Sequence, residues 1–137
     1  MTPGAMNHLA LTLSDLKAAE TAFYAPLLGF LGYAKIEDEP EMTLWFSQAA
    51  GAAVNLFQAV AELKDRPHER YAPGFHHFAF WAESRAQVDA LHARLIEIGA
   101  TILDPPAEYD YAPGYYAVFF ADPDGLKFEL VHMPLPA

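Results

Sequence analysis

The stretch over residues 115–132, YYAVFFADPDGLKFELVH, decides the fold of this chain. Two runs of aromatic and β-branched residues flank the turn-forming cluster Asp-Pro-Asp-Gly at 122–125. This pattern predicts a β-hairpin. In its second strand, Glu129 stands between the apolar residues Phe128 and Leu130. A carboxylate there is either exposed to solvent, which is the ordinary case, or directed into a pocket where it binds a ligand.

The composition indicates one compact domain. The chain has 137 residues, of which 53% are hydrophobic and 14% aromatic, which excludes a disordered chain. No apolar run approaches the ~18 residues of a membrane span, and the N-terminus does not resemble a secretory signal. Cysteine is absent, which excludes disulfides, thiolate nucleophiles and cysteine metal ligands. We expect a cytoplasmic protein, although a chain without cysteine is also compatible with export.

The charge balance argues against two classes of partner. The formal net charge is −10, from 18 acidic residues against 8 Lys and Arg. Such a chain repels nucleic-acid phosphates and anionic lipid surfaces, so we expect neither nucleic acid nor a membrane as partner. The basic residues are also scattered along the sequence, and no basic patch is predicted.

The first half of the chain predicts one β-α-β-β-β series. A strand over residues 7–13 precedes an amphipathic helix, which Ser14 caps and Pro26 bends or ends. The acidic residues 37–41 are expected to form a solvated loop. Three short strands complete the series, over residues 33–36, 43–47 and 53–60.

The second half repeats this series after a polar linker over residues 61–74. Ser84 and Gly99 are expected to delimit its helix, with an apolar stripe between them. The remaining predicted elements are a strand over 75–82, a short strand over 101–103, a proline-rich loop over 104–114 and the closing hairpin. The sequence therefore predicts an α+β fold of two tandem β-α-β-β-β units, over about residues 6–60 and 75–133, in a single domain.

Side-chain alternation places three residues on the face away from the helices. His8 precedes Leu9 and His77 precedes Phe78 at equivalent positions of the repeat, and Glu129 lies on the last strand. A lone histidine at a strand start is most often a surface or satisfied residue. The recurrence in both halves, together with the carboxylate, favours a shared role. Two imidazoles and one carboxylate form a ligand set for a divalent metal and leave positions open for a bidentate substrate.

Four segments resemble the vicinal oxygen chelate superfamily, which includes glyoxalases, bleomycin resistance proteins and extradiol dioxygenases. They are NHLALTLSDL at 7–16, FYAPLLGFLGY at 23–33, GFHHFAF at 74–80 and FFADPDGLKFELVH at 119–132. With the repeat they cover nearly the whole chain. The resemblance implies a curved mixed sheet around a cleft with the helices outside, and a homodimer.

The resemblance also implies a site. His8, His77 and Glu129 match the positions that hold one divalent ion (Zn, Fe, Mn or Ni) in the family. His76 aligns with Asn7 and is expected to face the other side. The fourth ligand position of glyoxalase I falls on Asn55, whose amide favours a three-ligand site and is expected to contact substrate.

Two activities within the family fit this sequence less well. Extradiol dioxygenases add a histidine before the last hairpin and a tyrosine within it, where this chain has Asp110-Tyr111-Ala112 and Phe119. Fosfomycin-modifying members bring cationic side chains to a phosphonate, whereas only Lys127 lies near this hairpin.

Aromatic residues are expected to line the substrate side. Trp81, Tyr115 and Phe119 share the predicted face of Glu129, and Tyr109 lies in the preceding loop with a further tyrosine. Aromatic residues at alternating spacing are most often simply core. On this face they would enclose an apolar or aromatic substrate, with Tyr115 as the proton-bearing catalytic candidate beside Glu129.

These observations predict a metal-dependent glyoxalase-like enzyme. It would bind a small oxygen-bearing substrate through two oxygens and carry out isomerase, lyase or transferase-type chemistry. A metal-free, drug-sequestering binding protein is the first alternative, although such members typically lack the ligand residues. An extradiol-type dioxygenase is the second.

Overall fold

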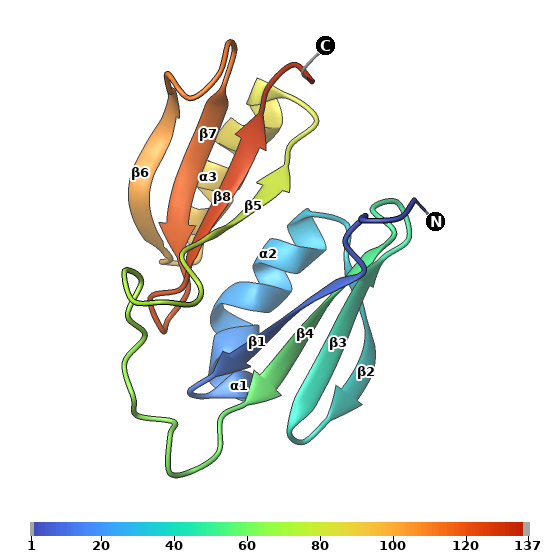
Figure 1. The fold of residues 1–137 in the computed structure, drawn as a ribbon, viewed down its shortest axis with the longest axis vertical. Coiled ribbons are helices and arrows are strands. Elements are labelled where there is room, and N and C mark those ends of the chain that lie inside the picture. The colour runs from blue at the N-terminus through green and yellow to red at the C-terminus, as the bar shows by residue number, and fades with distance from the viewer. Residues whose placement is uncertain (1, 136–137) are drawn as a thin grey trace. The chain divides into compact units, whose positions relative to one another are not determined.

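A computed structural model describes residues 2–135 of the chain, which forms two compact units, Met1–Arg66 and Pro67–Ala137. Each unit contains one four-stranded mixed sheet with helix packed on one face (Figure 1). The predicted fold class, α+β with two tandem β-α-β-β-β units, is confirmed. The single-domain organisation, with a linker over residues 61–74, stays a prediction.

The first unit begins with β1 (His8–Leu13) and a run of helix made of α1 (Leu16–Ala19), η1 (Glu20–Tyr24) and α2 (Ala25–Phe30). The strands β2 (Ala34–Glu39), β3 (Met42–Ser47) and β4 (Ala52–Gln58) follow. The sheet order is β1-β4-β3-β2, in which β1 is parallel to β4 and the other pairs are antiparallel. The expected apolar faces meet in its core, which includes Leu11, Leu13, Leu16, Phe23, Leu27, Val54 and Leu56.

The helical run differs from the prediction at its N-cap, and one of the two outcomes predicted at Pro26 is wrong. Asp15, not Ser14, is the N-cap, because its carboxylate accepts a hydrogen bond from the Ala18 N–H at 3.1 Å. The helix does not end at Pro26 but continues to Phe30. Pro26 lies in the first turn of α2, directly after the π-helical segment η1.

The acidic segment is also more ordered than expected. β2 extends through Glu39, so residues 37–39 belong to a strand and not to a loop. Their side chains are exposed, as a solvated segment requires. Antiparallel pairing with β3 supplies the backbone hydrogen bonds of this segment, while its charged side chains stay in solvent.

The carboxylate of Glu20, in η1, ties the helical run to the sheet. It accepts hydrogen bonds from Lys35 Nζ at 3.0 Å, Thr43 Oγ1 at 2.5 Å and Trp45 Nε1 at 3.0 Å. Burial raises the pKa of Glu20, but these hydrogen bonds and the charge of Lys35 lower it by more. The net pKa of Glu20 therefore lies below its ordinary value of 4.5.

The second unit contains β5 (Phe78–Trp81), α3 (Arg85–Glu97), β6 (Thr101–Glu108), β7 (Tyr116–Ala121) and β8 (Lys127–His132). The sheet order is β5-β8-β7-β6, and only β5 and β8 are parallel. The Ser84 hydroxyl caps α3 by accepting from the Gln87 N–H at 3.0 Å. The predicted stripe faces the sheet, with Val88, Leu91 and Leu95 fully buried.

Two strands of this unit have different bounds from those predicted. β5 begins at Phe78, so residues 75–77 lie outside it. β6 continues to Glu108 through two prolines that were expected in a loop. It is an edge strand with register shifts on both sides of Asp104, and an edge strand can accommodate residues that lack an N–H.

The closing hairpin forms as predicted. β7 and β8 pair in antiparallel register, from Tyr116 opposite His132 to Ala121 opposite Lys127. At the turn, Asp122 Oδ1 accepts from the backbone N–H of Asp124 at 2.9 Å and of Leu126 at 2.8 Å. Within residues 2–135, no helix has both the length and the apolar character of a membrane span.

The Glu20 network generates a prediction about stability and pH. Glu20→Gln should lower the free energy of unfolding by about 1–3 kcal/mol at neutral pH, because hydrogen bonds to a charged carboxylate are lost. Since the folded-state pKa is lowered, this contribution is present above the unfolded-state pKa and is lost as the pH falls through the folded-state value. Urea unfolding should therefore show the difference between the two proteins shrinking below about pH 4.5.

The matched control is Glu62→Gln, since Glu62 is exposed in the segment after β4. It should leave the free energy of unfolding unchanged. A Glu20→Gln difference that stayed constant from neutral pH to strongly acidic pH would contradict this account of the network.

Candidate functional site

Glu129 lies in the middle of the second unit's sheet and is only 2% exposed. Ala79 of β5 is its partner on one side and Phe119 of β7 on the other. Glu129 is thus not a solvent-exposed residue of the hairpin. A buried carboxylate is costly unless hydrogen bonds, a positive charge or a bound ligand compensate for the lost water.

Two side chains approach the two carboxylate oxygens of Glu129. The Tyr115 hydroxyl donates a hydrogen bond to Oε2, and His77 Nε2 lies 3.5 Å from Oε1. Burial disfavours the phenolate and the negatively charged Glu129 accepts the hydroxyl hydrogen, so the pKa of Tyr115 is raised well above its ordinary value of 10.0. Tyr115 therefore keeps its proton at neutral pH.

The surroundings of His77 favour its neutral imidazole. Burial is the largest effect and lowers the pKa of His77 below its ordinary value of 6.5. The negative charge of Glu129 opposes this, while the positive charges of Lys127 and Arg70 reinforce it. A neutral imidazole offers a nitrogen lone pair, which can bind a metal ion or accept a proton.

His76 also contacts this histidine, contrary to prediction. Its Nδ1 lies 2.6 Å from Nδ1 of His77, within hydrogen-bond distance. Side-chain alternation along a strand does not apply to His76 and His77, because both precede Phe78, the first residue of β5. The ring of Tyr71 lies edge-on to His76, with 5.7 Å between the ring centroids.

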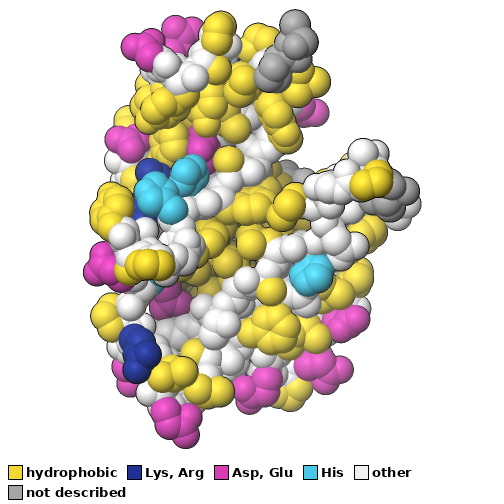
Figure 2. All heavy atoms as spheres, viewed as in Figure 1, with side chains coloured by type: hydrophobic (Ala, Val, Ile, Leu, Met, Phe, Trp, Pro, Cys, Tyr) yellow, Lys and Arg dark blue, Asp and Glu magenta, His cyan; other side chains and the backbone are white. Residues whose placement is uncertain are grey.

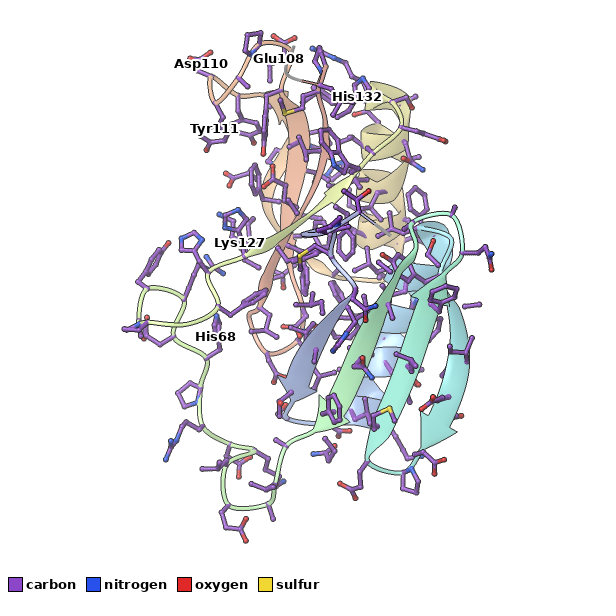
Figure 3. The ribbon with its side chains drawn as sticks, turned by 45° about the vertical axis from the view of Figure 1, so that its right-hand side comes forward. His68, Glu108, Asp110, Tyr111, Lys127 and His132 are labelled. Carbon is purple, nitrogen blue, oxygen red and sulfur yellow. The ribbon has the colours of Figure 1, made fainter. Side chains whose placement is uncertain are left out.

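Two basic side chains, Lys127 and Arg70, lie close enough to His77 to lower its pKa. Lys127, the first residue of β8, places Nζ 4.8 Å from the centroid of the Phe119 ring (Figure 3). Arg70 donates from Nη2 to the Gly125 carbonyl at 3.3 Å. Figure 2 shows atoms of basic side chains beside a pair of histidine rings. The place of Arg70 could not be predicted from the sequence, because it follows from the path of the segment before β5.

An apolar cluster surrounds this face of β7 and β8. Its buried members are Ala117, Phe119 and Val131, against which Leu103, Tyr109, Tyr115 and Met133 pack. Trp81 of β5, predicted on the same face, is 59% exposed. This face thus combines buried apolar residues with one exposed aromatic side chain, Trp81, that a ligand can contact.

Tyrosines extend this cluster into the loop after β6. The rings of Tyr109 and Tyr111 stack with 5.6 Å between centroids, and Tyr111 lies edge-on to Tyr115 at 5.3 Å. Tyr109 also contacts Phe119 edge-on at 5.3 Å. Tyr111 itself is 70% exposed, and Figure 3 shows it at the same end of the second unit as Glu108 and Asp110.

The first unit carries the other two predicted site residues. His8 is exposed at the start of β1, and its Nδ1 lies 2.8 Å from Asn7 Oδ1. Asn55 is half-buried on β4 opposite Ala10 of β1, and its Nδ2 lies 3.8 Å from Met42 Sδ. Alternation along both strands puts His8, Ala10 and Asn55 on one face.

The structure thus brings His77, Glu129, Tyr115 and Phe119 together within the second unit, while His8 and Asn55 belong to the first. Across residues 2–135, no three or more His, Asp or Glu side chains are grouped closely enough to hold a metal ion. The metal ligand set therefore stays a prediction.

Comparison with known proteins gives consistent relationships. The sequence model of the Glyoxalase/Bleomycin resistance protein/Dioxygenase superfamily matches residues 5–130. The uncharacterised protein YqjT of Bacillus subtilis is 34% identical over 134 residues, which cover 92% of this chain and 97% of YqjT. The metallothiol transferase FosB of Lysinibacillus sphaericus is 31% identical over 130 residues, which cover 94% of this chain and 82% of FosB.

Solved structures show the same fold. A Bacillus halodurans protein assigned to the glyoxalases superposes with a TM-score of 0.82 at 29% identity, over 94% of this chain and 96% of that one. The fosfomycin resistance protein FosX of Listeria monocytogenes superposes with a TM-score of 0.72 at 24% identity, over 98% and 97% of the two chains. The latter similarity concerns the fold alone.

The hydrogen bond from Tyr115 to Glu129 generates a stability prediction. Tyr115→Phe removes a donor to a buried carboxylate, so the free energy of unfolding should fall by about 1–3 kcal/mol. Tyr111→Phe is the matched control. The Tyr111 side chain is exposed, so loss of its hydroxyl should change the free energy of unfolding by less than about 0.5 kcal/mol. Urea unfolding at neutral pH measures both, and equal effects of the two substitutions would contradict the assignment.

Proposed function

The chain belongs to the Glyoxalase/Bleomycin resistance protein/Dioxygenase superfamily, and from this premise we propose that it is a divalent-metal-dependent enzyme acting on a small oxygen-bearing substrate. His8, His77 and Glu129 are the proposed ligands of a Zn, Fe, Mn or Ni ion. The observation that carries the proposal is the buried Glu129 carboxylate, with a neutral imidazole at one oxygen and a phenol at the other.

The donor set of the second unit fits a divalent cation. His77 Nε2 and Glu129 Oε1 are 3.5 Å apart, and the carboxylate is enclosed by an apolar cluster. Imidazole nitrogen and carboxylate oxygen are ligands that divalent first-row metals share. When bound, such a metal supplies a Lewis acid for substrate oxygens.

The surrounding residues have distinct proposed roles. Tyr115 donates its hydroxyl hydrogen to Glu129 Oε2 and so orients that carboxylate. It is also the candidate group for moving a proton to or from the substrate. Phe119 and its neighbours exclude water. Trp81 and Phe119 contact the apolar part of the substrate, and Asn55 offers an amide to its polar part.

Similarity to a metallothiol transferase favours group transfer among the possible reactions. FosB is 31% identical over 94% of this chain. The chain contains no cysteine, so a transferred thiol must come from a small-molecule substrate. Lys127 is not the only basic residue near the hairpin that could serve an anionic substrate, because Arg70 donates to the Gly125 carbonyl in its turn. Isomerase and lyase chemistry remain within the proposal.

Two other functions stay as alternatives to this proposal. A metal-free small-molecule binding protein would use the same aromatic face without the histidines. An extradiol-type dioxygenase would need a tyrosine where this chain has Phe119, a buried residue without an acid–base group. We also propose that the protein is a homodimer, as the family resemblance implies, with no nucleic-acid or membrane partner.

Metal analysis tests the proposal. The full chain, purified without a histidine tag and reconstituted with Mn²⁺, Zn²⁺, Fe²⁺ or Ni²⁺, should retain about one equivalent of one of them after desalting. His77→Ala and Glu129→Gln should lose it, whereas His92→Ala, on the outer helix α3, should not. No near-stoichiometric metal after reconstitution would refute metal dependence and favour the binding-protein alternative.

A thiol-consumption assay tests the transfer reaction. With cysteine as the thiol and a panel of small oxygen-bearing electrophiles, we expect thiol loss that requires the retained metal and drops to the background rate in Glu129→Gln. A metal-loaded protein that consumes no thiol with any electrophile of the panel would exclude transfer to these substrates and leave isomerase or lyase chemistry.

A further inference from the structure

In both units, the residue before the strand-start histidine contacts Nδ1 of that histidine. Asn7 Oδ1 lies 2.8 Å from His8 Nδ1, and His76 Nδ1 lies 2.6 Å from His77 Nδ1. Asn7 and His76 occupy equivalent positions of the repeat. Their side chains differ, but each can present a hydrogen-bond acceptor to the neighbouring ring.

In the first unit the direction of the hydrogen bond is fixed by chemistry. The amide oxygen of Asn7 can only accept, so the hydrogen must lie on Nδ1 of His8. A neutral imidazole carries a single N–H, so Nε2 of His8 then has a free lone pair.

In the second unit two ring nitrogens share one hydrogen, so one ring donates and the other accepts. The other nitrogen of His77, Nε2, lies 3.5 Å from Glu129 Oε1, beyond the 2.7–3.2 Å typical of an N–H···O hydrogen bond. By the repeat equivalence with Asn7 and His8, we assign His77 as the Nδ1–H donor and His76 as the acceptor, with the hydrogen of His76 on its own Nε2.

We propose that Asn7 and His76 are positioning residues that fix His8 and His77 in the Nδ1–H tautomer and so leave Nε2 of each ring free for a divalent cation. This inference rests on the proposed function, because the cation is what the free Nε2 atoms bind. Metal-binding histidines generally donate their second ring N–H to an acceptor, and loss of that acceptor weakens metal affinity about 10–100-fold.

The positions suit a test by substitution. Asn7, His8, His76 and His77 are all exposed to some degree and lie outside the buried cores of the units, so changes at 7 and 76 leave the folded protein intact. The chain also supplies its own conservative variants. Asn7→His and His76→Asn exchange the two acceptors, whereas Asn7→Leu and His76→Leu remove them.

The first measurement is a long-range ¹H–¹⁵N correlation spectrum of the full, metal-free chain at mildly alkaline pH. We expect His8 and His77 to carry hydrogen on Nδ1 and His76 on Nε2. The leucine variants should lose the Nδ1–H preference of the neighbouring ring, and the exchanged variants should keep it. Wild-type protein with the hydrogen of His8 and His77 on Nε2 would overturn the proposal.

The second measurement is Mn²⁺ affinity by titration calorimetry. Each leucine variant should bind Mn²⁺ about 10–100-fold more weakly than wild type, and each exchanged variant should recover most of that loss. Equal losses in leucine and exchanged variants would show a steric effect and overturn the proposal. Protein with the expected tautomers but without affinity for Mn²⁺, Zn²⁺, Fe²⁺ or Ni²⁺ would uphold the assignment of Asn7 and His76 while refuting the proposed function.

Discussion

The buried carboxylate of Glu129 is the constraint on which the second unit depends. A charged group that is 2% exposed must recover the free energy of its lost hydration from its neighbours. The Tyr115 hydroxyl supplies one hydrogen bond, and the imidazole of His77 faces the other oxygen at 3.5 Å without a hydrogen bond between them. This pairing of a buried carboxylate with an imidazole is the basis of the proposal that the site binds a cation.

The fold delivers these groups through strand pairing. The closing hairpin sets Glu129 beside Phe119, and the parallel β5 brings the segment that begins with His77 to the other side of β8. The first unit repeats the arrangement, since its strand-start histidine also leads into a strand parallel to the last strand of the unit. The two units therefore carry equivalent histidines, whereas only the second unit has a carboxylate on its last strand, where the first has Asn55.

The sequence predicted the features that depend on local pattern. The hairpin around residues 122–125, the repeat and the face shared by Glu129, Phe119 and Tyr115 all followed from turn chemistry and side-chain alternation. The contacts that depend on cross-strand register and loop path did not. Arg70, His76 and His77 lie beyond the strand ends, where alternation gives no information. Glu129 lies within β8, but its burial depends on the residues that pack around it from β5, β7 and Tyr115. The π-helical segment before Pro26 likewise has no periodic signal.

The most direct measurement of the central claim is anomalous diffraction from crystals of the chain grown with Mn²⁺. We predict one strong anomalous peak within bonding distance of Glu129 Oε1 and His77 Nε2, with Tyr115 still donating to Oε2 and a His8 side chain as a further ligand. A peak elsewhere, or crystals without bound Mn²⁺ in which Glu129 contacts only protein groups, would contradict the claim that this buried carboxylate is a metal ligand.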